Sequence, residues 1–405
     1  MHFCNGAFTM LRYSKLATAF VFGATALSAQ AYDINDWPTH YTFSDGTDIG
    51  LTGTYRFDVN DFSNDTLADG THRFEDSATN RRKELGITLK KKGVYDAIVD
   101  FEYQGRTWLD VFLRVQSKAF LGADYGAFRV GYSKTPVSFE GNTSTRADTF
   151  LELALPSQAI YESRRTGIDW AFERQSYILN LGYYFGQDLL GDNDGTTLGG
   201  RAAWTPHKQD GDVIHLGISG SREDRDTTTD GRGRINPATG RVVSPPETGL
   251  TPIRLIDSGT LAKVDHINRG GLEGLWIGGP LSVQGEVLRE NITRYGGNPN
   301  YSADGFYVFG SWVVTGESRP YSNGNVGNIK PNGTWGALEL LLRYSELDLN
   351  DGKILGGKEH DWTLGANWYL IQHFTFQANY IRATSEKGNL SLDPRIFELR
   401  AQIYF

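Results

Sequence analysis

Hydrophobic and polar residues alternate along the last eleven residues of the chain, RIFELRAQIYF. Apolar side chains occupy every second position from Phe397 to Phe405, and polar side chains such as Glu398 and Arg400 lie between most of them. A period of two indicates a β-strand whose two faces contact different environments. The alternation therefore predicts a strand with one face in an apolar medium and the other in a polar one.

The same alternation recurs along most of the chain, in segments of about 10 residues that together predict about 16 strands. It is clear in residues 49–59, 84–90, 95–103, 109–116 and 128–133, and clearest in residues 338–344, 362–370, 374–380 and 397–405. A soluble β-sandwich or propeller would also have period-two strands, but with polar outer faces. Aromatic side chains at the strand ends and the strand length favour a membrane barrel. We therefore predict an all-β fold, a transmembrane antiparallel β-barrel.

The connections between the predicted strands alternate between short and long. The tight ones are KKG, GADYG, ERQ, PHKQDGD, GGP and IQH, and the long ones are residues 61–80, 135–163, 187–197, 221–258 and 291–303. In outer-membrane barrels the periplasmic turns are short and the extracellular loops long. Residues 316–333 are the exception, because the alternation places this long segment on the periplasmic side.

The N-terminal region predicts export. Arg12 and Lys15 precede an uncharged run at residues 16–27, and the stretch AQA at residues 29–31 is typical of a signal-peptidase site. The run is too short for a membrane span, which needs about 20 residues. We predict a signal peptide over residues 1–31, with Met10 as a possible true start, and a mature barrel domain over residues 32–405.

Composition excludes several classes of function. The single cysteine, Cys4, lies in the predicted signal peptide, so disulfides and thiolate metal sites are not expected. Removing that segment leaves 38 basic against 48 acidic residues, a net charge of −10, which argues against nucleic acid as a partner. No linker-like segment divides the rest, so we expect one domain, with no cofactor and no metal.

Arginines recur on the polar faces of the predicted strands. Arginine keeps its charge at any pH and presents a planar fork to phosphate or carboxylate oxygens, so a series of them could attract anions into a lumen. Each could equally pair with an inward acid such as Asp58, Asp110 or Glu339 and stabilise the wall. The arginines are Arg56, Arg82, Arg114, Arg129, Arg201, Arg343 and Arg400.

Several stretches resemble the phosphate-selective porin O and P family. They are FRVGYSKTPVSFE, TFLELALP, GSWVVTGESRPY, WGALELLLRYSELDLND, WTLGANWYL and the terminal IYF. The resemblance implies a homotrimer of 16-stranded barrels in the bacterial outer membrane, surrounded by lipid and lipopolysaccharide. It also implies passive diffusion of small anions such as phosphate or diphosphate, and a terminal aromatic read by the barrel-assembly machinery.

The resemblance further implies that the loop at about residues 135–163 folds into the lumen, as does the exceptional segment 316–333 that carries Arg319. Lys134 and Arg146 are then the best candidates for anion contacts at the constriction, with Arg164 beside them. The same loop carries four acids, which puts strict phosphate specificity in doubt and leaves a weakly selective porin as the alternative: Glu140, Asp148, Glu152 and Glu162. Residues 221–258 are expected to form a solvated extracellular loop.

An outer-membrane enzyme or a passive adhesin is the other class of function. A barrel hydrolase needs a nucleophile, a base and an orienting group within hydrogen-bond reach. None of the histidines lies in a G-x-S-x-G or H-E-x-x-H motif. We therefore expect no catalytic residues.

Overall fold

The computed structural model describes residues 37–67, 70–191, 193 and 195–405. The predicted signal peptide, residues 1–31, lies outside the described residues. Residues 38–405 form one compact unit. No helix in the described part of the chain is long and apolar enough to cross a membrane.

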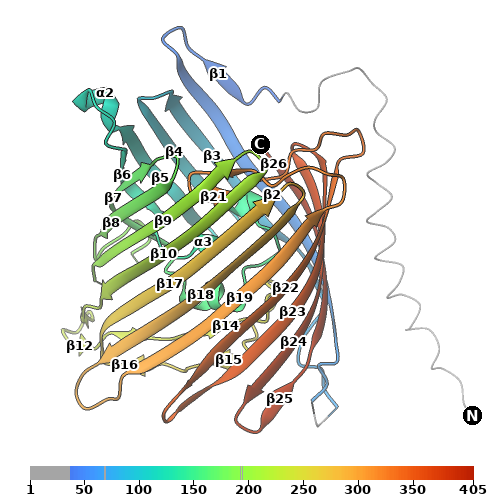
Figure 1. The fold of residues 1–405 in the computed structure, drawn as a ribbon. Coiled ribbons are helices and arrows are strands. Elements are labelled where there is room, and N and C mark those ends of the chain that lie inside the picture. The colour runs from blue at the N-terminus through green and yellow to red at the C-terminus, as the bar shows by residue number, and fades with distance from the viewer. Residues whose placement is uncertain (1–36, 68–69, 192, 194) are drawn as a thin grey trace, which may run out of the picture. The chain divides into compact units, whose positions relative to one another are not determined.

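Sixteen antiparallel strands form a closed barrel, as the alternation predicted (Figure 1). Each strand pairs with its neighbours in chain order, and the last strand pairs with the first through Thr54 and Tyr404, which closes the sheet. Closure leaves no unpaired edge, which is what a strand structure needs in lipid. The strands are β2 (Thr47–Ser63), β3 (Ser77–Lys91), β4 (Tyr95–Glu102), β5 (Thr107–Gln116), β6 (Ala127–Lys134), β7 (Arg164–Glu173), β8 (Tyr177–Tyr184), β9 (Thr197–Gln209), β10 (Asp212–Asp224), β17 (Val264–Gly278), β18 (Leu281–Arg294), β19 (Tyr301–Val313), β22 (Ala337–Asp351), β23 (Ile354–Ile371), β24 (Phe374–Lys387) and β26 (Arg395–Tyr404).

The remaining elements are short and lie in the links between barrel strands or extend a barrel strand as a hairpin. The helices are α2 (Ser117–Leu121), α3 (Phe139–Asn142), the 3-10 turn η1 (Thr145–Ala147) and α4 (Leu155–Ile160). The minor strands are β1 (His40–Thr42), β11 (Thr228–Thr229), β12 (Ile235–Asn236), β13 (Thr239–Gly240), β14 (Val243–Ser244), β15 (Ile256–Asp257), β16 (Leu261–Ala262), β20 (Tyr321–Ser322), β21 (Asn325–Val326) and β25 (Leu390–Leu392).

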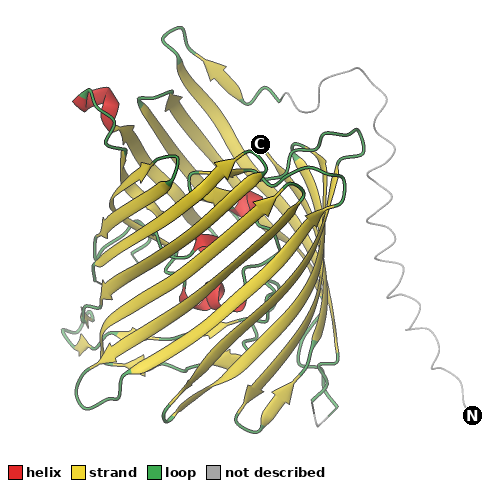
Figure 2. Cartoon of the chain, in the orientation of Figure 1, coloured by secondary structure: helices red, strands yellow, loops and turns green. Residues whose placement is uncertain are grey.

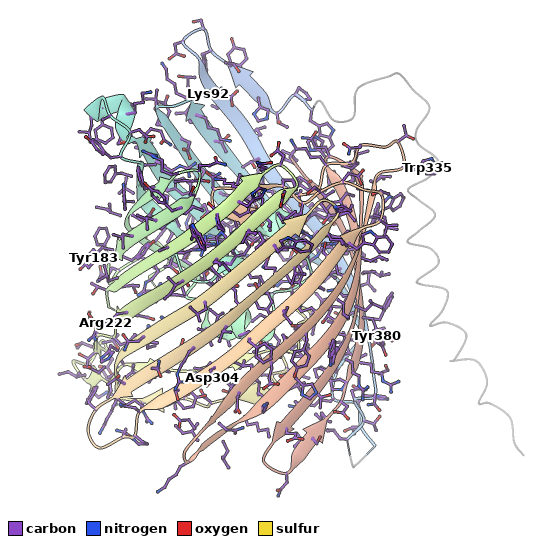
Figure 3. The ribbon with its side chains drawn as sticks, viewed as in Figure 1. Lys92, Tyr183, Arg222, Asp304, Trp335 and Tyr380 are labelled. Carbon is purple, nitrogen blue, oxygen red and sulfur yellow. The ribbon has the colours of Figure 1, made fainter. Side chains whose placement is uncertain are left out.

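The two faces of the wall differ as the alternation predicted. On β22, Leu340 and Leu342 are exposed on the outer surface, whereas Glu339 and Arg343 point inward and are fully buried. The side chain of Tyr380 on β24 likewise lies on the outside of the barrel (Figure 3). An outer band of exposed leucine, valine and aromatic side chains is the surface that a bilayer can cover.

The links between strands differ at the two ends of the barrel. At one end, here called the short-link end, five links have only two or three residues: 92–94, 174–176, 210–211, 279–280 and 372–373. The opposite, long-link end carries residues 64–76, 135–163, 185–196, 225–263 and 295–300, together with shorter links such as 103–106 and 352–353. The first barrel strand begins and the last one ends at the short-link end (Figure 1).

Candidate functional site

The interior of the barrel is largely occupied by chain. Residues 135–163, here called the inward loop, connect β6 to β7 and carry helices α3 and α4, which lie inside the wall (Figure 2). Phe150 packs edge-on against Phe309 of β19 at 5.4 Å between ring centroids, and Leu155 is buried in an apolar cluster with Tyr301. Apolar burial therefore fixes the loop against one side of the wall, formed by β18 to β26.

Polar side chains of that wall bind the backbone of the inward loop. Each donates a hydrogen bond to a loop carbonyl: Asn367 to Thr149 (2.8 Å), Gln377 to Asp148 (3.2 Å), Arg400 to Leu151 (2.7 Å) and Gln402 to Arg146 (3.1 Å). Arg400 and Gln402 thus lie on the inner face, as the alternation predicts, but they are buried under the loop, so the prediction that this face meets an open polar environment is wrong here. The physical reason is the loop, which covers this wall and needs donors for its buried carbonyls.

A second segment from the long-link end also enters the barrel. Residues 242–257, here called the inner segment, place Glu247 in full burial beside Arg343, with 2.7 Å between carboxylate Oε2 and guanidinium Nη2. Our expectation of a solvated loop over residues 221–258 holds for Arg232 and Arg234, which are exposed, and is wrong for the inner segment. Hydrogen bonds from Ser345 and Thr363 complete the surroundings of the Glu247 carboxylate.

The exceptional long link at the short-link end also folds inward. Residues 314–336, here called the insert, contain the β20–β21 hairpin. Tyr321 of the insert bonds through its hydroxyl to His215 Nδ1 of β10 at 2.6 Å, and Arg201 donates to the carbonyl of Gly324 at 2.8 Å. The insert therefore lies on the inner face of β9 and β10.

Four of the predicted anion-binding arginines are buried beneath these inward segments, with 0–3% of each side chain exposed. Each pairs with a carboxylate: Arg56 with Asp148, Arg319 with Glu339, Arg343 with Glu247 and Glu140, and Arg400 with Asp58. A buried guanidinium needs such a partner, because an uncompensated charge is costly away from water. At these positions the wall-pairing interpretation fits the geometry better than direct contact with a passing ion.

Four other predicted arginines lie on the opposite side of the barrel, on β3 and β5 to β7, and keep 14–40% of their side chains exposed. Each also has an acidic neighbour: Arg82 with Glu84 (3.1 Å), Arg114 with Asp96 (2.8 Å), Arg129 with Asp169 (2.7 Å) and Arg164 with Asp110 (3.0 Å). These side chains face the part of the interior that the inward loop leaves open.

Lys134 and Arg146 differ from the other predicted residues in their partners. The Lys134 ammonium donates to the carbonyls of Gly141 (2.8 Å) and Thr143 (2.5 Å), and Arg146 donates to Thr54 Oγ1 (2.9 Å) and to a terminal carboxylate oxygen of Phe405, the last residue of the chain (3.2 Å). Among the described residues, neither has a side-chain carboxylate within ion-pair distance. The positive charge of Lys134 is therefore less fully compensated than those of the paired arginines, whereas Arg146 lies against the terminal carboxylate of Phe405.

Sequence reasoning missed Arg81, because strict alternation would send it to the face opposite Arg82. A register shift in the pairing with β2, between Arg56 and Phe57, accommodates the extra residue and lets Arg81 bind Glu152 of the inward loop at 3.1 Å. Burial opposes ionisation of Glu152, but the nearby guanidinium groups, Arg81 foremost, outweigh it and lower the Glu152 pKa to about 2. Two adjacent arginines at a strand's long-link end are the signal that could have indicated a bulge.

The inward loop also carries Glu140, a carboxyl group whose pKa is raised, in contrast to that of Glu152. Glu140 accepts a hydrogen bond from the Ala154 backbone and lies 3.3 Å from Arg343, yet burial raises the Glu140 pKa to about 7. The loop therefore has an acid that changes protonation near neutrality. Among the described residues, no group of three or more His, Cys, Asp or Glu side chains is placed to hold a metal ion.

An open cleft lies where the inner segment approaches β3, with a volume of about 390 Å³. Arg81 and Asn80 line one side of it, and residues 249–252 line the other. Gly249 packs directly on the ion pair of Arg81 and Glu152, since a Cβ there would come within 2.6 Å of both side chains.

Comparison with known proteins gives a family match over most of the chain. The family model described as phosphate-selective porin O and P matches residues 49–405. Porin O of Pseudomonas aeruginosa is 27% identical over 216 residues, which cover 46% of this chain and 47% of that protein. An uncharacterised protein of Caulobacter vibrioides is 26% identical over 259 residues, covering 60% of this chain and 50% of that protein. The chain spans about half the length of the curated relatives it matches.

Solved structures with the same fold are outer-membrane barrels. An anion-selective porin from Comamonas acidovorans superposes with a TM-score of 0.56 at 13% identity, covering 89% of this chain and all of that one. OmpT, an outer-membrane protein of Vibrio cholerae, gives a TM-score of 0.56 at 12% identity, covering 90% of this chain and 99% of that one. At these identities the likeness extends to the fold alone.

Proposed function

Because the chain belongs to the phosphate-selective porin O and P family, and is thus a channel-forming porin of the bacterial outer membrane, we propose that it passes small anions by diffusion. Phosphate and diphosphate are the leading candidates. The family name and the Porin O relative support this preference, and the Comamonas neighbour is named as an anion-selective porin. No cofactor and no catalytic step belong to the proposal.

The observation that carries the proposal is the state of Lys134 and Arg146. Both are partly exposed, Lys134 at the end of β6 and Arg146 in the inward loop, and the Lys134 ammonium is held by two backbone carbonyls rather than by a carboxylate. These neutral acceptors hold Lys134 in place without cancelling its charge. In a narrow passage with walls of low dielectric constant, such charges raise the local concentration of anions.

Arg164, Arg129 and Arg114 extend this positive surface along β5 to β7, the wall that carries Lys134. Each is paired with one carboxylate, and a guanidinium has five N–H donors, so donors remain for an arriving phosphate or carboxylate oxygen. An anion could thus pass from one partly satisfied guanidinium to the next. Weak binding at several sites is what conduction requires, because an ion held tightly would not leave.

A weakly selective porin is the second candidate, and the pairing of these arginines favours it. Asp96, Asp110 and Asp169 each lie within 3.0 Å of an arginine on the open side, so much of the positive charge is balanced locally. A channel whose wall charges are balanced in this way would conduct small ions of either sign with little preference. Whether the channel is anion-selective or weakly selective depends on how strongly the charges of Lys134 and Arg146 dominate the electrostatic field in the passage.

Planar-bilayer recording with the purified protein tests the proposal. In a KCl gradient, an anion-preferring channel gives a reversal potential near that of chloride, and added phosphate reduces the chloride current by competing for the same groups. A reversal potential of zero, or one displaced toward the equilibrium potential of potassium, contradicts the anion preference. Conduction without phosphate block leaves the general porin as the better description.

We also propose that the channel works as a homotrimer within outer-membrane lipid and lipopolysaccharide, after insertion by the barrel-assembly machinery. One of the solved neighbours, OmpT of Vibrio cholerae, is described in a trimer form and gives a TM-score of 0.52 at 12% identity, with 89% of this chain and 99% of that one covered. The terminal aromatic residue of the last strand fits recognition by that machinery. Size-exclusion chromatography with light scattering in mild detergent measures the oligomeric state directly.

A further inference from the structure

The inward loop reaches the barrel interior from the long-link end and the insert reaches it from the short-link end, and the two meet at Asn325. The Asn325 amide nitrogen donates to the Phe139 carbonyl at 3.1 Å, and its amide oxygen accepts from Thr143 Oγ1 at 2.8 Å. One side chain therefore binds both ends of the turn at residues 139–143. The β20–β21 hairpin places Asn325 there, through its pairing of Tyr321 with Val326.

The same turn holds the Lys134 ammonium. Its carbonyls at Gly141 and Thr143 are the two acceptors of Lys134 Nζ. Asn325 and Lys134 therefore bind one five-residue turn through different atoms, and Thr143 contacts both of them. Displacing the turn would move the acceptors that fix the Lys134 charge.

The insert itself is firmly attached to the wall, so it can serve as a reference point. Val326 is buried with Phe139, Val213, Leu275 and Ile277 in one apolar cluster. Gly324 is packed so closely that a Cβ would lie 2.8 Å from Ile178. Apolar burial and close packing fix position more strictly than a single hydrogen bond does.

We infer that Asn325 is a positioning residue for ion selection: through the turn at residues 139–143, the insert sets where the Lys134 ammonium lies in the passage. The inference rests on the proposed function, in which Lys134 attracts anions. It adds that a segment from the short-link end of the barrel determines the geometry of a site formed by the last residue of β6 and the inward loop. The wall also holds the turn, because Glu286 of β18 accepts from the backbone N–H groups of Phe139 (2.6 Å) and Glu140 (2.8 Å), so Asn325 adds to an anchored turn.

Replacing Asn325 by Ala tests the inference, with Tyr321→Phe as the matched control. The control removes one hydrogen bond from the insert, to His215, but none to the inward loop. We expect Asn325→Ala to lower the anion-over-cation permeability ratio about threefold, because it removes two hydrogen bonds of ordinary strength from the turn. Tyr321→Phe should leave the ratio unchanged. Equal effects of the two variants would overturn the inference.

A double-variant cycle with Lys134→Gln separates positioning from general destabilisation. If Asn325 acts through Lys134, then Asn325→Ala should add little once the Lys134 charge is gone. Full additivity of the two shifts would mean that Asn325 acts independently of Lys134, and would overturn the inference. A Lys134→Gln variant with wild-type selectivity would instead count against the proposed function.

A distance measurement tests the positioning step even if selectivity does not depend on Lys134. Spin labels at Ser144→Cys and Lys92→Cys, with Cys4 replaced by Ser, report the position of the inward loop relative to the short-link end, where Lys92 lies (Figure 3). We expect Asn325→Ala to broaden or shift the distance distribution and Tyr321→Phe to preserve it. An unchanged distribution in Asn325→Ala would show that the turn stays in place without this side chain.

Discussion

Removing the positive charges of Lys134 and Arg146 should weaken the anion preference by a calculable amount. We choose Lys134→Gln together with Arg146→Gln, because the Lys134 ammonium donates to the carbonyls of Gly141 and Thr143. A glutamine amide can still donate to such oxygens, whereas a glutamate would repel them and displace the inward loop. The double Gln variant therefore changes charge while preserving hydrogen-bonding capacity.

The magnitude follows from Coulomb's law. An anion about 6 Å from one unit charge gains about 0.7 kcal/mol in water, and about 0.4 kcal/mol after screening at about 0.1 M salt. Two such charges amount to about 0.8 kcal/mol, or about fourfold in local anion concentration. Cations change by the same factor in the opposite sense, so the permeability ratio should fall about 15-fold. Low-dielectric walls would increase this value.

The assay is the reversal potential of single channels in a KCl gradient, at two ionic strengths. Arg232→Gln with Arg234→Gln is the control, because both side chains are exposed on the outer part of the 225–263 link. The passage variant should shift strongly toward cations and the control should shift little. A shift of equal size in both, or in neither, would refute the assignment of Lys134 and Arg146 as the charges that select ions.

Three further predictions concern the wall and its inward segments. Leu364→Arg, on the outer face near the middle of β23, should destabilise the folded barrel by roughly 2–4 kcal/mol, measured by urea unfolding in vesicles. Alternation alone would suggest that Asn367→Arg is tolerated. We expect it to be harmful, because Asn367 is fully buried under the inward loop. Glu247→Ala should leave the Arg343 guanidinium without its nearest carboxylate and lower the stability of the docked inner segment by about 3–5 kcal/mol, seen as faster proteolysis within residues 226–241. Replacing both Glu247 and Arg343 by Met should restore resistance to the protease. Burial raises the Glu140 pKa from 4.5 to about 7, so Glu140 loses its proton at a lower pH when the loop is undocked than when it is docked. Docking of the inward loop should therefore be strongest below about pH 4.5, weaken as the pH rises to about 7 and then level off. Loop-closure noise in current records should follow that curve, and the pH dependence should disappear in Glu140→Gln, a variant that keeps Asp148 and Glu152.

Local sequence determined the barrel wall. A period of two is a property of neighbouring residues, so it identified the outer face at Leu340 and Leu342 and the inner face at Glu339 and Arg343 without any knowledge of partners. The alternation of short and long links likewise indicated which strand ends share a side. Both signals can be read from the sequence because the membrane and the barrel interior differ in polarity at every strand.

The charged residues were only partly predictable. The sequence named the inward arginines, but it left each between wall pairing and ion contact. Only the structure distinguished Arg343, fully buried beside Glu247, from Arg164, which is paired with Asp110 but stays 14% exposed. The two partners in the first pair are 96 residues apart, so no local pattern links them. Arg81 was missed for the same kind of reason, because a register shift depends on the paired strand.

What the sequence by itself determined is therefore the barrel: its class, its strand number, the direction of its faces and a short set of candidate charges, all set by the local alternation of polarity. Tertiary structure alone decided what fills the barrel. The inward loop, the inner segment and the insert are held by contacts between residues far apart in the chain, as between Asn325 and Phe139. Their apolar clusters and buried ion pairs form only when the closed wall brings those residues together, and that long-range packing decides which charges remain free to meet an ion.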